Sequence, residues 1–343
     1  MSGAPDATAA LRISTGGPFF EELRVGDVLD AAPALTLTDG QAALHQAIVG
    51  DRLRLPLDAR LSAQVVGAQA ALAHPALVCD VAIGQSTLVT QRVIANLFYR
   101  GLVLRRAPVI GDTLHTTTEV VALRQNRGRP GRAATGLAAL RIRTTDQEGR
   151  RVLDFWRCAM LPLRDPSGTT GQADDLDAIP ASLDAQAMRE AVADWDLAAF
   201  RRAAPGVHAH DLLEGTCWTV EGGDVVSAAP ELARLSLNIA MAHHDEHGSS
   251  GRRLVYGGHT IGLAAAQATR ALPNLVTIVA WHGCDHLGPV FEGDTLLSEL
   301  ELERTEPLGA EGGTLVHLRS RVRARRADET VDVLDWRFVG VMA

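Results

Sequence analysis

Pro108-Val109-Ile110-Gly111-Asp112-Thr113-Leu114 returns later in the chain as Pro289-Val290-Phe291-Glu292-Gly293-Asp294-Thr295-Leu296, with its two aspartates 182 positions apart. A second pair of stretches, 152–157 (VLDFWR) and 333–337 (VLDWR), lies at an offset of 181 positions. Two independent matches at nearly one offset indicate an internal duplication. We therefore predict one fold built twice along the chain.

The repeat divides the 343 residues into four segments. We predict a flexible tail (1–17), an N-terminal copy (18–165), a linker with a helix (166–205) and a C-terminal copy (206–343). The cluster 165–171 (DPSGTTG) is polar and turn-forming, which marks the linker. The apolar spacing of 184–204 predicts a helix that ends before Pro205.

Within each copy, one apolar segment and several alternating runs predict the same architecture. The apolar helices are expected at about 62–74, stopped by Pro75, and at about 258–272, stopped by Pro273. Runs such as 114–123 and 296–303 alternate with period two, as in antiparallel strands. An apolar helix wrapped by an antiparallel sheet, twice over, gives an α+β fold class.

Composition excludes several function classes. The net charge of −8 argues against nucleic acid as a partner, and no window approaches the ~18 apolar residues of a membrane span. The N-terminus lacks the basic and apolar regions of a signal peptide. The four cysteines are widely spread without zinc spacing, so we expect a reduced, cytoplasmic protein that binds no metal.

Several stretches resemble the MaoC-like hydratases, which have the hot-dog fold. These are 19–29 (FFEELRVGDVL) and the hairpin 146–149 (DQEG). The stretches 48–58 (IVGDRLRLPLD) and 255–263 (VYGGHTIGL) resemble the double hot-dog branch of mesaconyl-CoA hydratases, also called β-methylmalyl-CoA dehydratases. The resemblance covers nearly the whole chain beyond the tail.

This resemblance implies a duplicated hot-dog fold and a hydro-lyase that acts on a CoA thioester without a cofactor. It implies the reversible dehydration of β-methylmalyl-CoA to mesaconyl-CoA, within acyl-CoA assimilation such as the ethylmalonyl-CoA pathway. Two alternatives stay open: an (R)-specific enoyl-CoA hydratase for another acyl chain, and a non-catalytic acyl-CoA-binding hot-dog protein. A dicarboxylate substrate predicts a cation deep in the pocket, whereas a straight-chain substrate predicts an apolar tunnel. Further assembly into a homo-oligomer is also left open.

Hydration of an enoyl thioester needs a base, a proton donor to Cα and a group that stabilises the thioester oxygen. MaoC-like hydratases carry Asp followed five residues later by His. In the C-terminal copy His243 matches that histidine, but Asn238 stands where the aspartate belongs; in the N-terminal copy Asp51 is present and Pro56 replaces the histidine. Either His243 works with Asn238 alone, or Asp51 reaches across the interface between the copies.

The helix start after Tyr256 is the candidate oxyanion site. Gly257, Gly258 and His259 open the apolar helix, where free backbone N–H groups can point at a carbonyl oxygen. The alternative is a tight turn without a catalytic role.

Candidate substrate contacts lie nearby in the sequence. They are Arg252, Arg253, His244 and Tyr256. Arginine suits the phosphates and carboxylates of such a substrate because its planar fork binds them in pairs of hydrogen bonds. The run 243–247 (HHDEH) is geometrically awkward for zinc, and we assign no metal to it.

Overall fold

The computed structural model describes residues 13, 15–128, 131–246, 251–309 and 313–343. The N-terminal copy contains η1 (Phe20–Glu22), β1 (Val28–Leu29), β2 (Leu35–Thr36), α1 (Asp39–Val49), α2 (Arg54–Leu57), α3 (Ala59–Val66), α4 (Pro75–Gln85), η2 (Ser86–Leu88), β3 (Ala95–Leu104), β4 (Thr113–Gln125), β5 (Thr135–Thr145) and β6 (Arg151–Pro162). The segment that follows contains η3 (Leu176–Ala178), α5 (Ala185–Glu190) and α6 (Leu197–Ala203). The C-terminal copy contains η4 (Ala209–Asp211), β7 (Cys217–Thr219), β8 (Asp224–Val225), α7 (Ala229–Leu235), η5 (Met241–His243), α8 (Gly257–Ala271), β9 (Leu275–His286), β10 (Thr295–Pro307), β11 (Thr314–Arg325) and β12 (Thr330–Met342).

The strands of the described residues form one antiparallel sheet of 12 strands in which the two copies mirror each other. The order is β1-β4-β5-β6-β3 in the first copy and β9-β12-β11-β10-β7 in the second, with β2 and β8 paired to β4 and β10. The copies join where β3 pairs with β9, at Leu102↔Trp281 and Val103↔Ala280. This arrangement is the double hot-dog fold and confirms the predicted α+β duplication.

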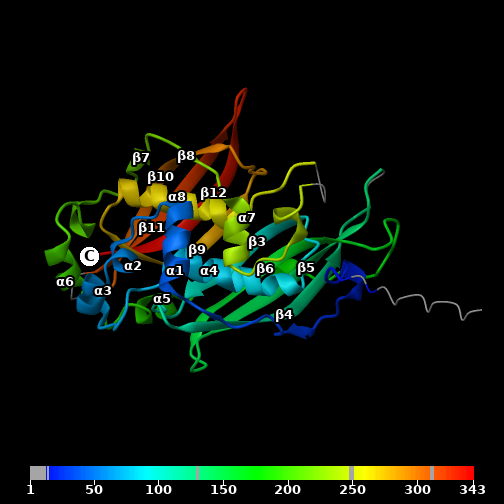
Figure 1. The fold of residues 1–343 in the computed structure, drawn as a ribbon, viewed down its shortest axis with the longest axis horizontal. Coiled ribbons are helices and arrows are strands. Elements are labelled where there is room, and N and C mark those ends of the chain that lie inside the picture. The colour runs from blue at the N-terminus through cyan, green and yellow to red at the C-terminus, as the bar shows by residue number, and fades with distance from the viewer. Residues whose placement is uncertain (1–12, 14, 129–130, 247–250, 310–312) are drawn as a thin grey trace, which may run out of the picture.

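The two central helices, α4 and α8, contact each other and lie together on one face of the sheet (Figure 1). All eleven residues of α4 are buried, and α8 is buried along most of its length. Because both helices are apolar on nearly every side, sheet and neighbouring helix together cover them. The end of α4 and the start of α8 line a cavity between the two copies.

The predicted C-terminal apolar helix is confirmed to within one residue, but the predicted N-terminal one is wrong. Residues 62–74 do not form the central helix: α3 ends at Gly67, which has a left-handed backbone (φ 71°), and the central helix begins at Pro75. Proline starts a helix as readily as it stops one, because a first-turn residue needs no N–H bond. His74 caps this start through Nδ1, which accepts the Ala76 N–H.

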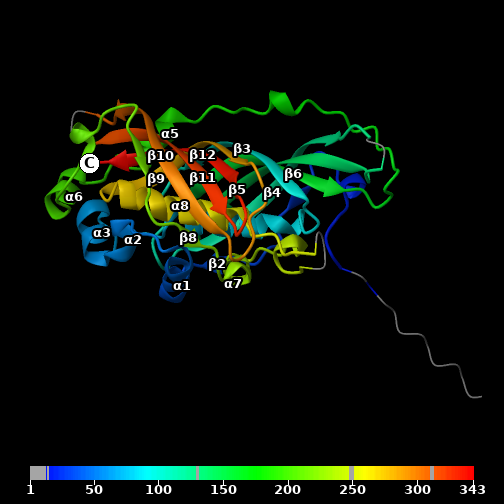
Figure 2. The same cartoon turned by 90° about the horizontal axis from the view of Figure 1, so that it is seen from above.

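The linker helix predicted over 184–204 is two short helices, α5 and α6, separated by a turn. Asp196 begins the second helix by accepting the Ala199 N–H at 2.7 Å, which favours a break there. Before α5 the linker runs along the face of the sheet opposite to α8 (Figure 2), where Leu176 and Ile179 pack on strands β4 to β6. Among the described residues, no helix is both long and apolar enough to cross a membrane.

Candidate active site

A cavity of about 280 Å³ lies between the two copies. The end of α4, the segment after it and strands β3 and β6 form one wall; the loop before η5, the start of α8 and the segment after β9 form the other. The lining residues with polar groups or special backbone are Thr87, Thr90, Asn96, Tyr99, Arg157, Asn238, His243, Tyr256, Gly257, Thr260, His286 and Gly288.

His243 contributes a neutral imidazole to this cavity. Its Nδ1 lies 2.9 Å from the backbone oxygen of Leu254, and since a carbonyl can only accept, Nδ1 carries the proton. Nε2 therefore keeps its lone pair. Burial lowers the pKa of His243 to about 4; the hydrogen bond to Leu254 opposes this only in part, and the charge of Arg157 acts in the same direction as burial. At neutral pH this side chain is a proton acceptor.

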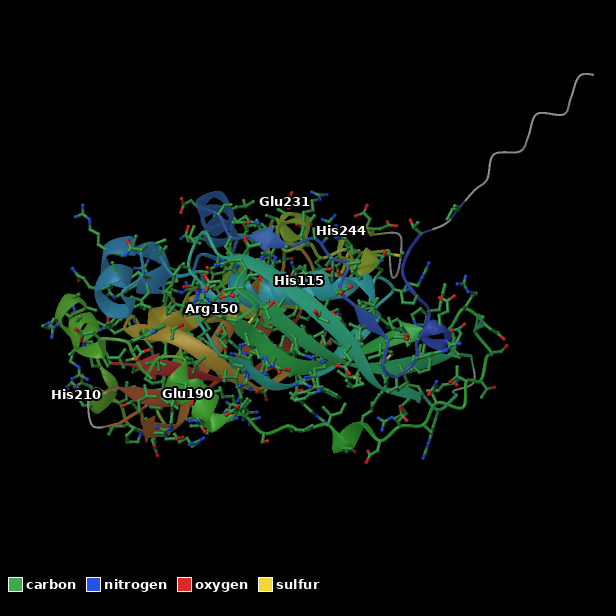
Figure 3. All side chains as sticks on the ribbon, turned by 90° about the horizontal axis from the view of Figure 1, so that it is seen from below. His115, Arg150, Glu190, His210, Glu231 and His244 are labelled. Atoms are coloured by element: carbon green, nitrogen blue, oxygen red, sulfur yellow. The ribbon has the colours of Figure 1, made fainter. Side chains whose placement is uncertain are left out.

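Asn238 lines the same cavity and is held by its surroundings. Its Oδ1 accepts the Ala240 N–H at 3.0 Å, which leaves the Nδ2 amide as its remaining hydrogen-bonding group. His244, labelled in Figure 3, bonds through Nε2 to the backbone oxygen of Asn238 at 2.6 Å. His244 thus fixes the loop rather than the His243 ring, and it does not line the cavity.

The start of α8 presents backbone to the cavity. No side chain caps this helix at Tyr256, and Gly257 lines the cavity directly. A Cβ on Gly257 would lie 2.6 Å from the His286 ring, and one on Gly258 would lie 2.1 Å from Asp80 Oδ1. Both positions therefore need glycine for close packing. Gly257 therefore brings backbone at the start of α8 to the cavity wall.

Two neighbours of these glycines differ in their exposure to the cavity. Tyr256 lines it, with its ring centroid 5.6 Å from that of His243; burial raises the pKa of its hydroxyl well above the ordinary value. The His259 side chain is fully buried and does not line the cavity, so only its place in the first helical turn relates it to the oxyanion prediction.

Asp51 lies in a different cluster from His243. Its Oδ2 is 2.6 Å from His74 Nε2, and its Oδ1 accepts the Leu53 N–H. Burial raises the pKa of this carboxyl, but His74 and the Leu53 N–H outweigh burial, so the net pKa is lowered. The structure does not bring Asp51 to the cavity, which favours the alternative in which His243 works with Asn238.

Arg252 and Arg253 flank the cavity but do not line it. Arg253 forms an ion pair with Glu292, and the Arg252 guanidinium stacks 3.8 Å from the Phe291 ring centroid. Since Leu254 and Val290 do line the cavity, both arginines lie beside residues of its wall.

Arg157 is a cavity residue that sequence reasoning missed. It is 3% exposed, and its Nη2 donates to Thr90 Oγ1 at 2.8 Å and to the backbone oxygen of Ser86 at 3.4 Å. The repeated stretches 152–157 and 333–337 both end in arginine, which suggests Arg337 as the counterpart of Arg157. When the two strands are aligned on Asp154 and Asp335, however, the counterpart of Arg157 is Phe338. An arginine on the inward-facing side of a strand was the available signal.

The matching part of the second groove, at the start of α4, is filled. At positions 182 residues earlier, Ala73, Pro75 and Leu104 replace Val255, Gly257 and His286, and together with Ala107 and Pro108 they line a space of only about 10 Å³. Ala191, Val192 and Trp195, which lie between α5 and α6, complete its lining. The linker therefore occupies the second groove, and Pro75 has no N–H to offer there.

Comparison with known proteins identifies the family of this chain. No protein-family profile matches it. It is 30% identical over 296 residues to a beta-methylmalyl-CoA dehydratase of Chloroflexus aurantiacus, covering 83% of this chain and 82% of that protein. It is also 30% identical over 299 residues to a mesaconyl-CoA hydratase of Cereibacter sphaeroides, covering 82% of each. The chain belongs to the MaoC-like double hot-dog hydratases.

Two solved structures support the same fold for this hydratase. A conserved hypothetical protein of Mycobacterium tuberculosis with a double hot-dog fold is 54% identical, with a TM-score of 0.89 over 96% of this chain and 100% of that one. A MaoC domain protein dehydratase from Chloroflexus aurantiacus is 26% identical, with a TM-score of 0.84 over 96% of this chain and 99% of that one.

The hydratase thus brings four of the residues singled out from sequence into one cavity: Asn238, His243, Tyr256 and Gly257. Gly258 supports the same helix start, and His244 supports the Asn238 loop. Asp51, Arg252, Arg253 and His259 lie outside the lining. As a member of this family the chain is a hydro-lyase.

Proposed function

We propose that this hydratase catalyses the reversible hydration of an α,β-unsaturated CoA thioester, with mesaconyl-CoA and β-methylmalyl-CoA as its substrate and product. The observation that carries the reaction type is His243, a neutral base fixed at Nδ1, in one cavity with the N-terminus of α8. The two relatives that are 30% identical, named as a beta-methylmalyl-CoA dehydratase and a mesaconyl-CoA hydratase, support the choice of acyl chain.

The proposed mechanism needs one water molecule and no other reactant. Nε2 of His243 removes a proton from water as its oxygen bonds to Cβ, and negative charge develops on the thioester oxygen. The Gly257 N–H and the positive end of α8 stabilise that charge. The His243 imidazolium then returns the proton to Cα, so the water adds completely across the double bond.

Asn238 has a positioning role in this scheme. An amide does not exchange protons as a carboxylate does, but Nδ2 can donate a hydrogen bond to the attacking water while Ala240 holds Oδ1. A second proton acceptor is not required, because His243 both removes the proton and returns it.

The test is the loss of enoyl-thioester absorbance with mesaconyl-CoA and crotonyl-CoA in parallel. We expect turnover by the wild type and a fall in kcat of about 10²–10⁴-fold in His243→Ala, the usual contribution of a general base. His210→Ala is the matched control, because His210 is a surface histidine that lies well apart from His244 in Figure 3. Undiminished turnover by His243→Ala would contradict the mechanism, and no turnover of any enoyl-CoA would favour an acyl-CoA-binding protein.

A further inference from the structure

Arg157 is a buried cation without a carboxylate partner. Among the described residues, no acidic side chain lies within ion-pair distance of it, and its Nε has no hydrogen-bond partner. The two bonds of Nη2 leave most of its five N–H donors unused. Burial lowers its pKa, because desolvation disfavours the charged form. A protein retains an unpaired buried charge at a substantial free-energy cost.

The fold does not need a cation at this position. Strand β12 of the other copy has Phe338 at the corresponding place, fully buried in the core. An apolar side chain therefore satisfies the same site in the same architecture. The difference between the two strands coincides with a difference between the two grooves: Arg157 is on the wall of the open cavity, whereas Phe338 lines neither that cavity nor the filled groove.

We propose that Arg157 binds the free carboxylate of an acyl chain that carries this group on Cβ. This inference rests on the proposed function, because it assumes that His243 acts on the double bond of a bound enoyl thioester. A carboxylate on Cβ is one bond from the carbon that water attacks, so its partner must share the cavity with the base. Arg157 and His243 line one cavity of about 280 Å³.

The charge of Arg157 would also assist the attack itself. A carboxylate on Cβ repels an oxygen that gains negative character as His243 removes its proton. A guanidinium bonded to that carboxylate offsets the repulsion, and in a protein interior of low dielectric constant the effect of one charge is larger than in bulk water. Arg157 is therefore a specificity-determining residue whose substrate contact lowers the barrier for carboxylated chains.

The direct test compares fumaryl-CoA with crotonyl-CoA, which differ in having a carboxylate or a methyl group on Cβ. We expect the wild type to prefer fumaryl-CoA, and Arg157→Met to reduce kcat/KM for fumaryl-CoA by about 10²–10³-fold, the usual effect of removing one partner of a buried charge pair. Turnover of crotonyl-CoA should be unchanged or increased. Arg337→Met, on the equivalent strand but paired with Glu303 at the surface, should match the wild type.

A binding measurement separates this inference from the proposed function. Succinyl-CoA and butyryl-CoA have no double bond, so calorimetry reports recognition without turnover. We expect the wild type to bind succinyl-CoA more tightly and Arg157→Met to reverse that order. An unchanged order of affinities overturns the role of Arg157 even if hydration is confirmed, whereas a reversed order with no hydration of any substrate overturns the proposed reaction alone.

Stability distinguishes recognition from a structural role. Because Arg157→Met removes an unpaired buried charge, we expect its melting temperature to equal or exceed that of the wild type. A clear decrease would indicate a structural cation and contradict the inference. If Arg157→Met does not fold, Arg157→Lys keeps the charge without the planar fork. It should reduce the preference for fumaryl-CoA about tenfold, and an unchanged preference would overturn the proposal.

Discussion

His243 combines deep burial with a fixed hydrogen bond at Nδ1, and in the proposed mechanism its pKa sets the pH range of the reaction. Burial lowers its pKa to about 4, so the base is neutral throughout the physiological range. An exposed histidine, with a pKa near 6.5, would lose much of its base function at mildly acidic pH.

We predict that kcat/KM for hydration is flat from neutral pH to about pH 5 and falls below it with a midpoint near 4. The sign follows from the role of the group: as pH falls through the lowered pKa, Nε2 gains a proton and no longer accepts one from water. Stopped-flow measurement of initial rates after brief exposure to each pH checks this, with circular dichroism to show that the chain stays folded. A midpoint near 6.5 would contradict the buried base.

At the level of single residues, sequence reasoning identifies the motif-bearing side chains but not those defined by packing. His243 and Gly257 belong to recognisable local patterns, so their place in one cavity could be anticipated. The place of Arg157 could not be anticipated, because direct comparison of the two repeated stretches pairs it with Arg337. Alignment of the two strands on their aspartates makes Phe338 its counterpart. Asp51 carries the right chemistry for the family motif, but His74 holds it elsewhere.

At the level of elements, α4 determines where the loop with Asn238 lies in the other copy. A Cβ on Gly84 would lie 1.8 Å from the Ser236 backbone oxygen and 3.0 Å from the Asn238 nitrogen. The loop packs directly on the backbone of α4, and Leu237 between these two residues has a positive φ of 61°. Such a backbone is strained for a non-glycine residue and is maintained only by its surroundings.

We therefore predict that Gly84→Ala displaces the Asn238 loop and lowers kcat at least about tenfold, with a loss of stability of about 1–3 kcal/mol from overpacking. Gly40→Ala is the matched control, because Gly40 also lies in a helix and its nearest contact for a Cβ is 3.8 Å away. That variant should keep full activity. Enoyl-CoA turnover and thermal unfolding of both variants check the prediction, and full activity of Gly84→Ala would show that the loop tolerates the shift.

The elements themselves were predictable to different degrees. The strands follow from period-two alternation, and the C-terminal central helix follows from a long apolar run. Each of these patterns is typical of one kind of element. The N-terminal central helix was misplaced because Pro75 can end one helix or begin the next, and only the tertiary packing of 75–85 in the core distinguishes these. The apolar spacing of the linker predicts one helix because it continues across the turn before Asp196.

At the level of the whole molecule, the two copies differ at the start of the central helix: among the described residues, the groove is open beside Gly257 and filled beside Pro75. The linker residues Ala191, Val192 and Trp195 fill the second groove, and Pro75 lacks the N–H that Gly257 offers. The arrangement could not be anticipated from the repeat, because similar sequences in two copies suggest two similar sites.

We predict that one CoA thioester binds per chain. Calorimetric titration of the intact protein with succinyl-CoA should give a stoichiometry of one, and His243→Ala should give the same value because its groove remains. A stoichiometry of two would show that the linker leaves the second groove under solution conditions.

Joining β3 to β9 within one polypeptide also removes a restriction that a dimer of identical subunits cannot escape. In such a dimer every substitution appears twice, so an arginine suited to one groove would be buried in both. Here each half mutates independently: one half has Arg157 facing a ligand cavity and the other has Phe338 in a solid core. The two halves thus keep a similar backbone but differ in their side chains. A duplicated scaffold can therefore acquire a preference for charged substrates while it buries only one unpaired charge.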